Sequence, residues 1–125
     1  MTVKERRPCV VVVEDHDVAR RTLSRLLEAN GYDVRPAATV QEALYVIEHH
    51  GCDLLISDMI LPDGTGLELM RALAERRQTP VAIAMTGRTS ADDQAEFVEA
   101  GFAGFVPKPV LFTQLLTEVE RLLPH

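Results

Sequence analysis

The sequence has no tryptophan, only two cysteines, and 5% aromatic residues among its 125 positions. Cys9 and Cys52 have the spacing of neither a metal knuckle nor a redox pair, so we expect reduced thiols and a cytoplasmic setting. No apolar run is long enough to span a bilayer, and residues 1–7 lack the apolar core of a signal peptide. We therefore expect no contact with a membrane.

Positive charge is also in short supply, with 13 lysines and arginines against 19 acidic residues and a formal net charge of −6. This balance argues against non-specific binding to nucleic acid or to an anionic lipid surface. The length fits one domain, and a hydrophobic content of 46% is sufficient for an ordinary core. We predict a single domain over residues 1–125, with residues 1–7 as an N-terminal tail.

Short apolar runs alternate with amphipathic stretches along the whole chain. The expected strands are residues 8–13, 32–35, 54–56, 81–85 and 104–106, and a segment with helical apolar spacing follows each of them. Capping patterns at Thr39–Glu42, Thr65–Glu68 and Ser90–Asp93 mark three helix starts, and Gly101 marks a helix end. This alternation predicts an α/β fold, a flavodoxin-like (βα)5 three-layer sandwich whose five-stranded parallel sheet has the order 2-1-3-4-5.

An abrupt change from apolar to acidic residues follows the first expected strand. We interpret Asp17 as the N-cap of the next helix and His16 as a surface residue without a partner. The inward-facing positions expected for that helix are Val18, Leu23, Leu26 and Leu27.

Polar residues stand at the ends of four expected strands. Glu14 and Asp15 follow the first strand, Asp58 the third, Thr86 the fourth and Lys108 the fifth. Ligands bind at the carboxyl ends of parallel strands, and adjacent strands lie roughly 5 Å apart, so we expect these side chains to converge. Two carboxylates about 4 Å apart repel by roughly 4 kcal/mol at an effective dielectric of 20. The cluster therefore calls for a bound cation or for one acid that keeps its proton.

The types of residue in this cluster indicate phosphoryl chemistry. Oxygen ligands favour Mg²⁺ or Mn²⁺, the Thr86 hydroxyl can bond an oxygen held beside Asp58, and Lys108 can partly bridge the roughly 10 Å from the fifth strand to the third. Each residue alone has a common alternative: a solvated aspartate, a Thr-Gly turn, or a loop lysine in solvent. Their conjunction, in this order, predicts a carboxylate nucleophile, a divalent ion, a hydrogen-bond donor and a cation for phosphoryl oxygens.

The chain resembles the receiver domain of two-component response regulators over nearly its whole length. The matching stretches are Val11–Asp15, Leu54–Gly64, Ala84–Gly87 and Gly104–Pro109. The resemblance implies that Asp58 accepts a phosphoryl group from a histidine kinase or phosphotransfer protein, and that a downstream protein or fused output domain reads the result. It implies a regulatory domain with at most self-phosphorylation and dephosphorylation chemistry and with no direct contact with nucleic acid. It leaves open a homodimer that forms on phosphorylation. The receiver of a hybrid histidine kinase is one form that it allows.

The same resemblance assigns a role to each site residue. It implies that Asp15, Asp58 and the backbone carbonyl of Ile60 hold Mg²⁺, with Glu14 helping directly or through water. Thr86 and Lys108 would grip the phosphoryl oxygens, and Phe105 occupies the aromatic switch position. The peptide bond between Lys108 and Pro109 is expected to be cis, and phosphorylation to change the surface of the last two helices.

Two other classes of protein share parts of the pattern. The stretch Pro62-Asp-Gly-Thr65 is similar to the Asp-x-Asp-Gly-Thr signature of haloacid-dehalogenase phosphatases, but Leu61 stands where the nucleophilic aspartate belongs. Steady phosphate release from a generic ester would favour that alternative. A flavin-binding module of the same topology would want a hydroxyl- and glycine-rich loop where this chain has Glu14–Asp17. A colourless protein would argue against it.

Overall fold

A five-stranded parallel sheet forms the centre of the structure, a computed structural model that describes residues 7–123. Its strands are β1 (Cys9–Val13), β2 (Asp33–Ala37), β3 (Leu54–Asp58), β6 (Val81–Thr86) and β7 (Gly104–Pro107). They lie in the order β2-β1-β3-β6-β7, which in chain order is the predicted 2-1-3-4-5. The strands β1 and β3 are buried along their whole length, as expected of central strands covered on both faces.

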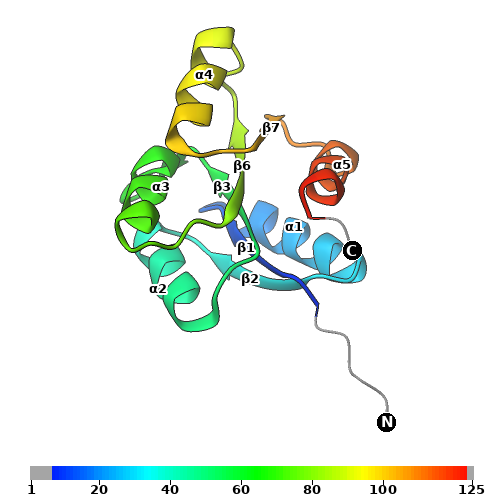
Figure 1. The fold of residues 1–125 in the computed structure, drawn as a ribbon. Coiled ribbons are helices and arrows are strands. Elements are labelled where there is room, and N and C mark those ends of the chain that lie inside the picture. Colours follow the sequence, from blue (N-terminus) through cyan, green and yellow to red (C-terminus); the bar gives the residue numbers. More distant parts are fainter. Residues whose placement is uncertain (1–6, 124–125) are drawn as a thin grey trace.

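Helices cover both faces of this sheet (Figure 1). The helices are α1 (Asp17–Ala29), α2 (Val40–His50), α3 (Gly66–Glu75), α4 (Ala91–Ala100) and α5 (Phe112–Leu122). Buried residues of α2, α3 and α4 share one core cluster, and those of α1 and α5 share the other. The predicted three-layer α/β sandwich is therefore confirmed. No helix within residues 7–123 has both the length and the apolar character that crossing a membrane requires.

The three capping patterns form as the sequence predicts. The side-chain oxygens of the N-cap residues accept bonds from backbone N–H groups three residues on: Thr39 from Glu42 at 3.0 Å, Thr65 from Glu68 at 3.1 Å, and Ser90 from Asp93 at 3.1 Å. At the other end of α4, Gly101 takes a left-handed conformation with φ 110°. These bonds satisfy amide groups that a helix start otherwise leaves without partners.

The start of α1 differs from the prediction. Asp17 is the first residue of the helix rather than its N-cap, and its carboxylate accepts a bond from Arg20 at 2.6 Å. His16 occupies the N-cap position without a side-chain capping bond. Leu23 and Leu27 are buried as predicted, whereas Val18 is 72% exposed and Leu26 is 37% exposed. Val18 lies in the first turn, beside a groove rather than against the sheet.

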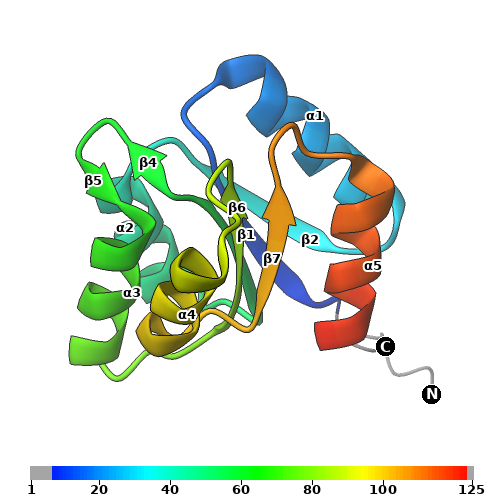
Figure 2. The ribbon, with the colours of Figure 1, turned by 90° about the horizontal axis from the view of Figure 1, so that it is seen from above.

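A small antiparallel hairpin links β3 to α3. It consists of β4 (Ile60–Leu61) and β5 (Gly64–Thr65), with Ile60 paired to Thr65 and Leu61 to Gly64. The turn between the two strands holds Pro62 and Asp63, as the turn-forming composition indicates. Figure 2 shows this hairpin beside α2, at the edge of the sheet where the first helix also begins.

Candidate functional site

The carboxyl-terminal edge of the sheet brings the predicted site residues together around one pocket. Strand β3 lies between β1 and β6, with Val13 paired to Ser57 and Asp58 to Met85. The side chains that follow these strands therefore face the same edge. The pocket measures about 400 Å³ and is lined by Asp15, His16, Asp58, Met59, Ile60, Thr65, Leu67, Thr86, Gly87, Arg88, Phe97 and Lys108.

Asp58 is held at both of its carboxylate oxygens. Its Oδ1 accepts a 2.7 Å hydrogen bond from the backbone N–H of Met59 and a longer one, 3.4 Å, from that of Ile60. Its Oδ2 lies 2.7 Å from the Nζ atom of Lys108. Only 7% of the Asp58 side chain is exposed. The structure thus places an oriented carboxylate against the ammonium group of Lys108, which pairs with Asp58 instead of extending into solvent as a loop lysine would.

Glu14, Asp15 and His16 form a cluster beside Asp58. The Oε2 atom of Glu14 accepts bonds from the backbone N–H of His16 and from its Nδ1, both at 3.2 Å. The same Nδ1 lies 3.4 Å from Asp15 Oδ1. The bond to Glu14, followed by the charge of Asp15, raises the pKa of His16. The interpretation of His16 as a surface residue is confirmed by its 76% exposed side chain, but the expectation that it has no partner is wrong.

The donor atoms at this edge suit a hard divalent cation. One ligand atom each from Glu14, Asp15 and His16 lie within 4.8 Å of one another. Asp58 is outside that tight group, and its Oδ2 is bound by Lys108 instead. Asp15, Asp58 and Ile60 all line the pocket, so carboxylate and backbone oxygens outnumber the single imidazole. An oxygen-rich donor set of this kind fits Mg²⁺ or Mn²⁺.

Thr86 is buried at the end of β6 and is engaged with its own loop. Its hydroxyl accepts a 2.9 Å bond from the Arg88 backbone N–H and donates a 3.3 Å bond to the Arg88 carbonyl. The Arg88 guanidinium pairs with Asp93 at 2.5 Å. The Ser90 hydroxyl, with the Arg88 charge, lowers the pKa of Asp93 despite partial burial. The loop after β6 is therefore closed on itself, and both hydrogen bonds of the Thr86 hydroxyl go to Arg88 instead of Asp58.

Two aromatic rings connect the pocket to the last strand. Phe105 in β7 is half-buried, and its ring centroid lies 5.9 Å from that of Phe97 in α4. Phe97 is 1% exposed, lines the pocket and also contacts Phe102 edge-on. Phe97 is not among the site residues predicted from the sequence. Its position as the one aromatic residue in α4 is the signal that points to it.

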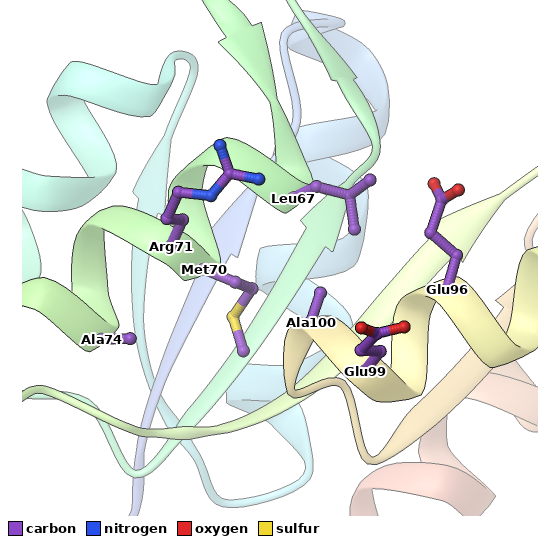
Figure 3. Close-up of a pocket in the computed structure, with 7 residues that line it drawn as sticks. All are labelled: Leu67, Met70, Arg71, Ala74, Glu96, Glu99 and Ala100. Atoms are coloured by element: carbon purple, nitrogen blue, oxygen red, sulfur yellow. The ribbon is translucent and has the colours of Figure 1, made fainter.

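A second hollow lies between α3 and α4 (Figure 3). It measures about 620 Å³ and is lined by Leu67, Met70, Arg71, Ala74, Glu96, Glu99 and Ala100. Leu67 lines this hollow and the pocket at Asp58 as well. Helix α4 also lines both, with Phe97 at the pocket and Glu96 at the hollow, so a displacement of α4 would change the shape of both.

Gly66 allows the close approach of α3 to the end of β3. A Cβ atom at this position would lie 3.0 Å from the backbone oxygen of Asp58 and 2.8 Å from the sulfur of Met59. The methionine can move, but the Asp58 carbonyl belongs to a buried strand. We expect Gly66→Ala to lower the free energy of unfolding by about 1–3 kcal/mol, as overpacking does, and to slow reactions at Asp58. Urea titration measures the change in the free energy of unfolding.

Gly87→Ala provides the matched control, since a Cβ there would meet nothing within 4 Å. It is expected to leave the unfolding transition nearly unchanged. If the Gly66→Ala protein is as stable as the Gly87→Ala protein, the end of β3 can shift without lowering the free energy of unfolding.

The fold and site define a member of a known class of signalling domain. The model of the response regulator receiver domain family matches residues 10–120, and the chain belongs to that family. It is accordingly a phosphoryl-accepting signalling domain of two-component systems, with a regulatory role rather than an enzymatic one.

Individual relatives agree with this assignment. The chain is 32% identical over 114 residues to the response regulator MprA of Mycobacterium sp. (strain KMS) and 33% identical over 114 residues to the TorCAD operon transcriptional regulatory protein TorR of Escherichia coli (strain K12). The alignments cover 91% of this chain but 50% and 49% of those proteins, so the chain spans about half the length of the curated relatives it matches.

Solved structures show the same fold. The chemotaxis response regulator CheY4 of Vibrio cholerae superposes with a TM-score of 0.89 at 30% identity, over 94% of this chain and 100% of that one. The non-phosphorylated HemR receiver domain of Leptospira biflexa gives 0.86 at 29% identity, over 95% and 96%.

The family match does not support the haloacid-dehalogenase alternative or the flavin-binding one. The Asp63-Gly64-Thr65 stretch that suggested a phosphatase lies in the β4–β5 hairpin. Asp63 there bonds to the start of α2 instead of lining the pocket.

Proposed function

We propose that Asp58 is the phosphoryl acceptor and that the donor is a phosphohistidine on a histidine kinase or phosphotransfer protein. The 2.7 Å contact between Lys108 and Asp58 carries this proposal, because it orients a nearly buried carboxylate beside a cation. In the transfer, an Asp58 oxygen forms a bond to phosphorus while the bond from phosphorus to the donor imidazole nitrogen breaks. Lys108 then offsets the charge on the phosphoryl oxygens, and water later cleaves the acyl phosphate to regenerate the carboxylate.

We propose that the ion at this site is Mg²⁺, with Mn²⁺ as a substitute, held by Asp15, Asp58 and the backbone carbonyl of Ile60. Glu14 would help directly or through water. When bound, the ion supplies positive charge that neutralises the phosphoryl oxygens during transfer. The half-exposed Asp15 and the buried Glu14 are each poised to bind from the β1 side of the pocket.

The switch that we propose starts at Thr86. Phosphorylation adds about −1.5 to −2 charge to an already acidic edge. The Thr86 hydroxyl leaves its two bonds to Arg88 for a phosphoryl oxygen, the loop after β6 moves, and Phe105 turns inward. The outer surfaces of α4 and α5 change as a result. For this switch, phosphorylation needs to change the free-energy difference between two existing conformations by only a few kcal/mol.

A groove beside the pocket offers the donor a place to dock. It is formed by α1 and the segment after β7, where Val18 is 72% exposed and lies near Pro109 and Val110. The signal would then pass to a downstream protein or a fused output domain. A single receiver domain over residues 1–125, and a homodimer that forms on phosphorylation, stay predictions.

Labelling of the purified protein tests the proposed function. With acetyl phosphate and Mg²⁺, we expect intact-mass spectrometry to show one added phosphoryl group, which peptide mapping after borohydride reduction assigns to Asp58. Chelation of the metal should prevent the addition. Continuous release of phosphate from a generic ester, with no covalent adduct, would contradict the proposal.

Phe105→Trp provides a reporter for the switch, because the chain has no other tryptophan. The half-buried position gives the indole partial contact with water in the resting state. We expect its fluorescence maximum to move to shorter wavelength when acetyl phosphate and Mg²⁺ are added. The same reporter combined with Asp58→Asn should not respond; an equal response in both proteins would exclude phosphorylation as its cause.

A further inference from the structure

Asp63 makes two bonds to a part of the chain that is distant in sequence. It lies in the turn of the β4–β5 hairpin, and its Oδ1 accepts from the backbone N–H of Val40 at 2.8 Å. Its Oδ2 accepts from the N–H of Gln41 at 3.0 Å. Val40 and Gln41 are the first two residues of α2, 23 and 22 positions earlier in the chain.

These bonds complete the N-terminus of α2. A helix start leaves its first amide groups without intrahelical partners, and the Thr39 hydroxyl satisfies only that of Glu42. The Asp63 carboxylate takes the two preceding amides and sits at the positive end of the helix dipole. Partial burial raises the pKa of Asp63, but the bonds from Val40 and Gln41 outweigh that effect and leave the pKa lowered. The carboxylate is thus ionised where it contacts the helix.

The same hairpin is attached to the phosphoryl site at its other end. The N–H of Gly66 donates to the carbonyl of Met59 at 3.0 Å, and Ile60 pairs with Thr65. Ile60 cannot anchor this segment by side-chain packing, because it is 76% exposed. A Cβ atom on Gly64 would lie only 3.3 Å from a methyl carbon of Val40, so hairpin and helix are already in close contact. The backbone around Ile60 is therefore fixed to Asp58 on one side and to α2 on the other.

We propose that Asp63 is a positioning residue for the metal site: by fastening the hairpin to α2, it holds the Ile60 backbone where the ion needs a carbonyl ligand. The inference rests on the proposed function, in which Ile60 supplies that ligand. Asp63 does not touch the pocket and acts only through the loop.

Magnesium affinity of the unphosphorylated protein separates this role from simple helix capping. Isothermal titration calorimetry with Mg²⁺ is carried out on the wild type and on Asp63→Ala, Asp63→Asn and Thr39→Ala. Thr39→Ala is the matched control, since it removes another capping bond from the same helix start but none from the hairpin. Thermal unfolding without metal measures how far each variant weakens the fold.

We expect Asp63→Ala to weaken Mg²⁺ binding by roughly tenfold, the size of effect seen for groups that orient metal ligands. Asp63→Asn keeps one acceptor oxygen and should lie between this variant and the wild type. Thr39→Ala should lower the unfolding temperature as Asp63→Ala does, while it leaves Mg²⁺ affinity unchanged.

Equal Mg²⁺ affinity in wild type and Asp63→Ala, or an equal loss in Asp63→Ala and Thr39→Ala, would overturn the positioning role and leave the proposed function intact. A wild-type protein that binds no Mg²⁺ would overturn both.

Discussion

Asp58→Asn is expected to abolish phosphoryl labelling by acetyl phosphate and Mg²⁺. The amide has the shape of the carboxylate and keeps an oxygen that can accept the bond from the Met59 N–H, so the fold is retained. It lacks the anionic oxygen that we propose attacks phosphorus, and it removes one of the three acids of the proposed metal site. Intact-mass spectrometry over a time course, with circular dichroism to verify folding, measures the result.

Asp53→Asn is the matched control for this substitution. Asp53 precedes β3 at the opposite edge of the sheet, where its carboxylate accepts a 2.7 Å bond from the Cys9 N–H. The control protein should be labelled like the wild type. Labelling of Asp58→Asn at the wild-type rate would place the acceptor elsewhere.

Lys108→Ala is expected to change phosphorylation and metal binding in opposite directions. Loss of the ammonium group removes a cation that stabilises phosphoryl oxygens, so labelling by acetyl phosphate should slow by about 10²-fold. The same ammonium repels a bound ion. A unit charge and a divalent ion about 4 Å apart repel by roughly 2 kcal/mol even in water, so Mg²⁺ affinity should rise by at least about tenfold.

Arg76→Ala controls for the loss of one positive charge. Arg76 follows α3 and makes a long, exposed 3.7 Å ion pair with Glu48. Its substitution should therefore change neither the rate of labelling by acetyl phosphate nor the affinity for Mg²⁺. Weaker Mg²⁺ binding in Lys108→Ala would show that this lysine supports the metal site instead of competing with it.

The fold and most of the site were predictable because both depend on local pattern. The buried run before Asp58 and the polar residue after each strand follow from strand length and side-chain type, and parallel strands then bring their ends together. The contact between Asp58 and Lys108 follows from that geometry once the strand order is known.

The details of the loops were not predictable in the same way. Asp17 and His16 are adjacent, and which of them becomes the N-cap depends on the path by which the chain leaves β1. The partner of His16 is Glu14, two residues away, which no helical or strand period indicates. Helical spacing places Val18 on the inner stripe of α1, but it does not show that the first turn of this helix leaves the side chain exposed beside a groove.

Contacts between distant segments leave even less trace in the sequence. Asp63 meets α2 only because the hairpin folds beside the start of that helix, and neither segment contains a sign of the other. Phe97 in α4 likewise contacts Phe105 in β7, and the sequence around neither residue indicates that the two rings meet.

The single buried side chain of α4 has an evolutionary consequence. Phe97 is its one buried residue, whereas α3 buries Gly66, Leu69, Met70 and Leu73. Substitutions on the outer face of α4 therefore remove few core contacts and cost little folding stability. If a partner recognises this face, as we propose, selection can change the residues that it contacts while the acceptor chemistry and the scaffold beneath them are inherited unchanged.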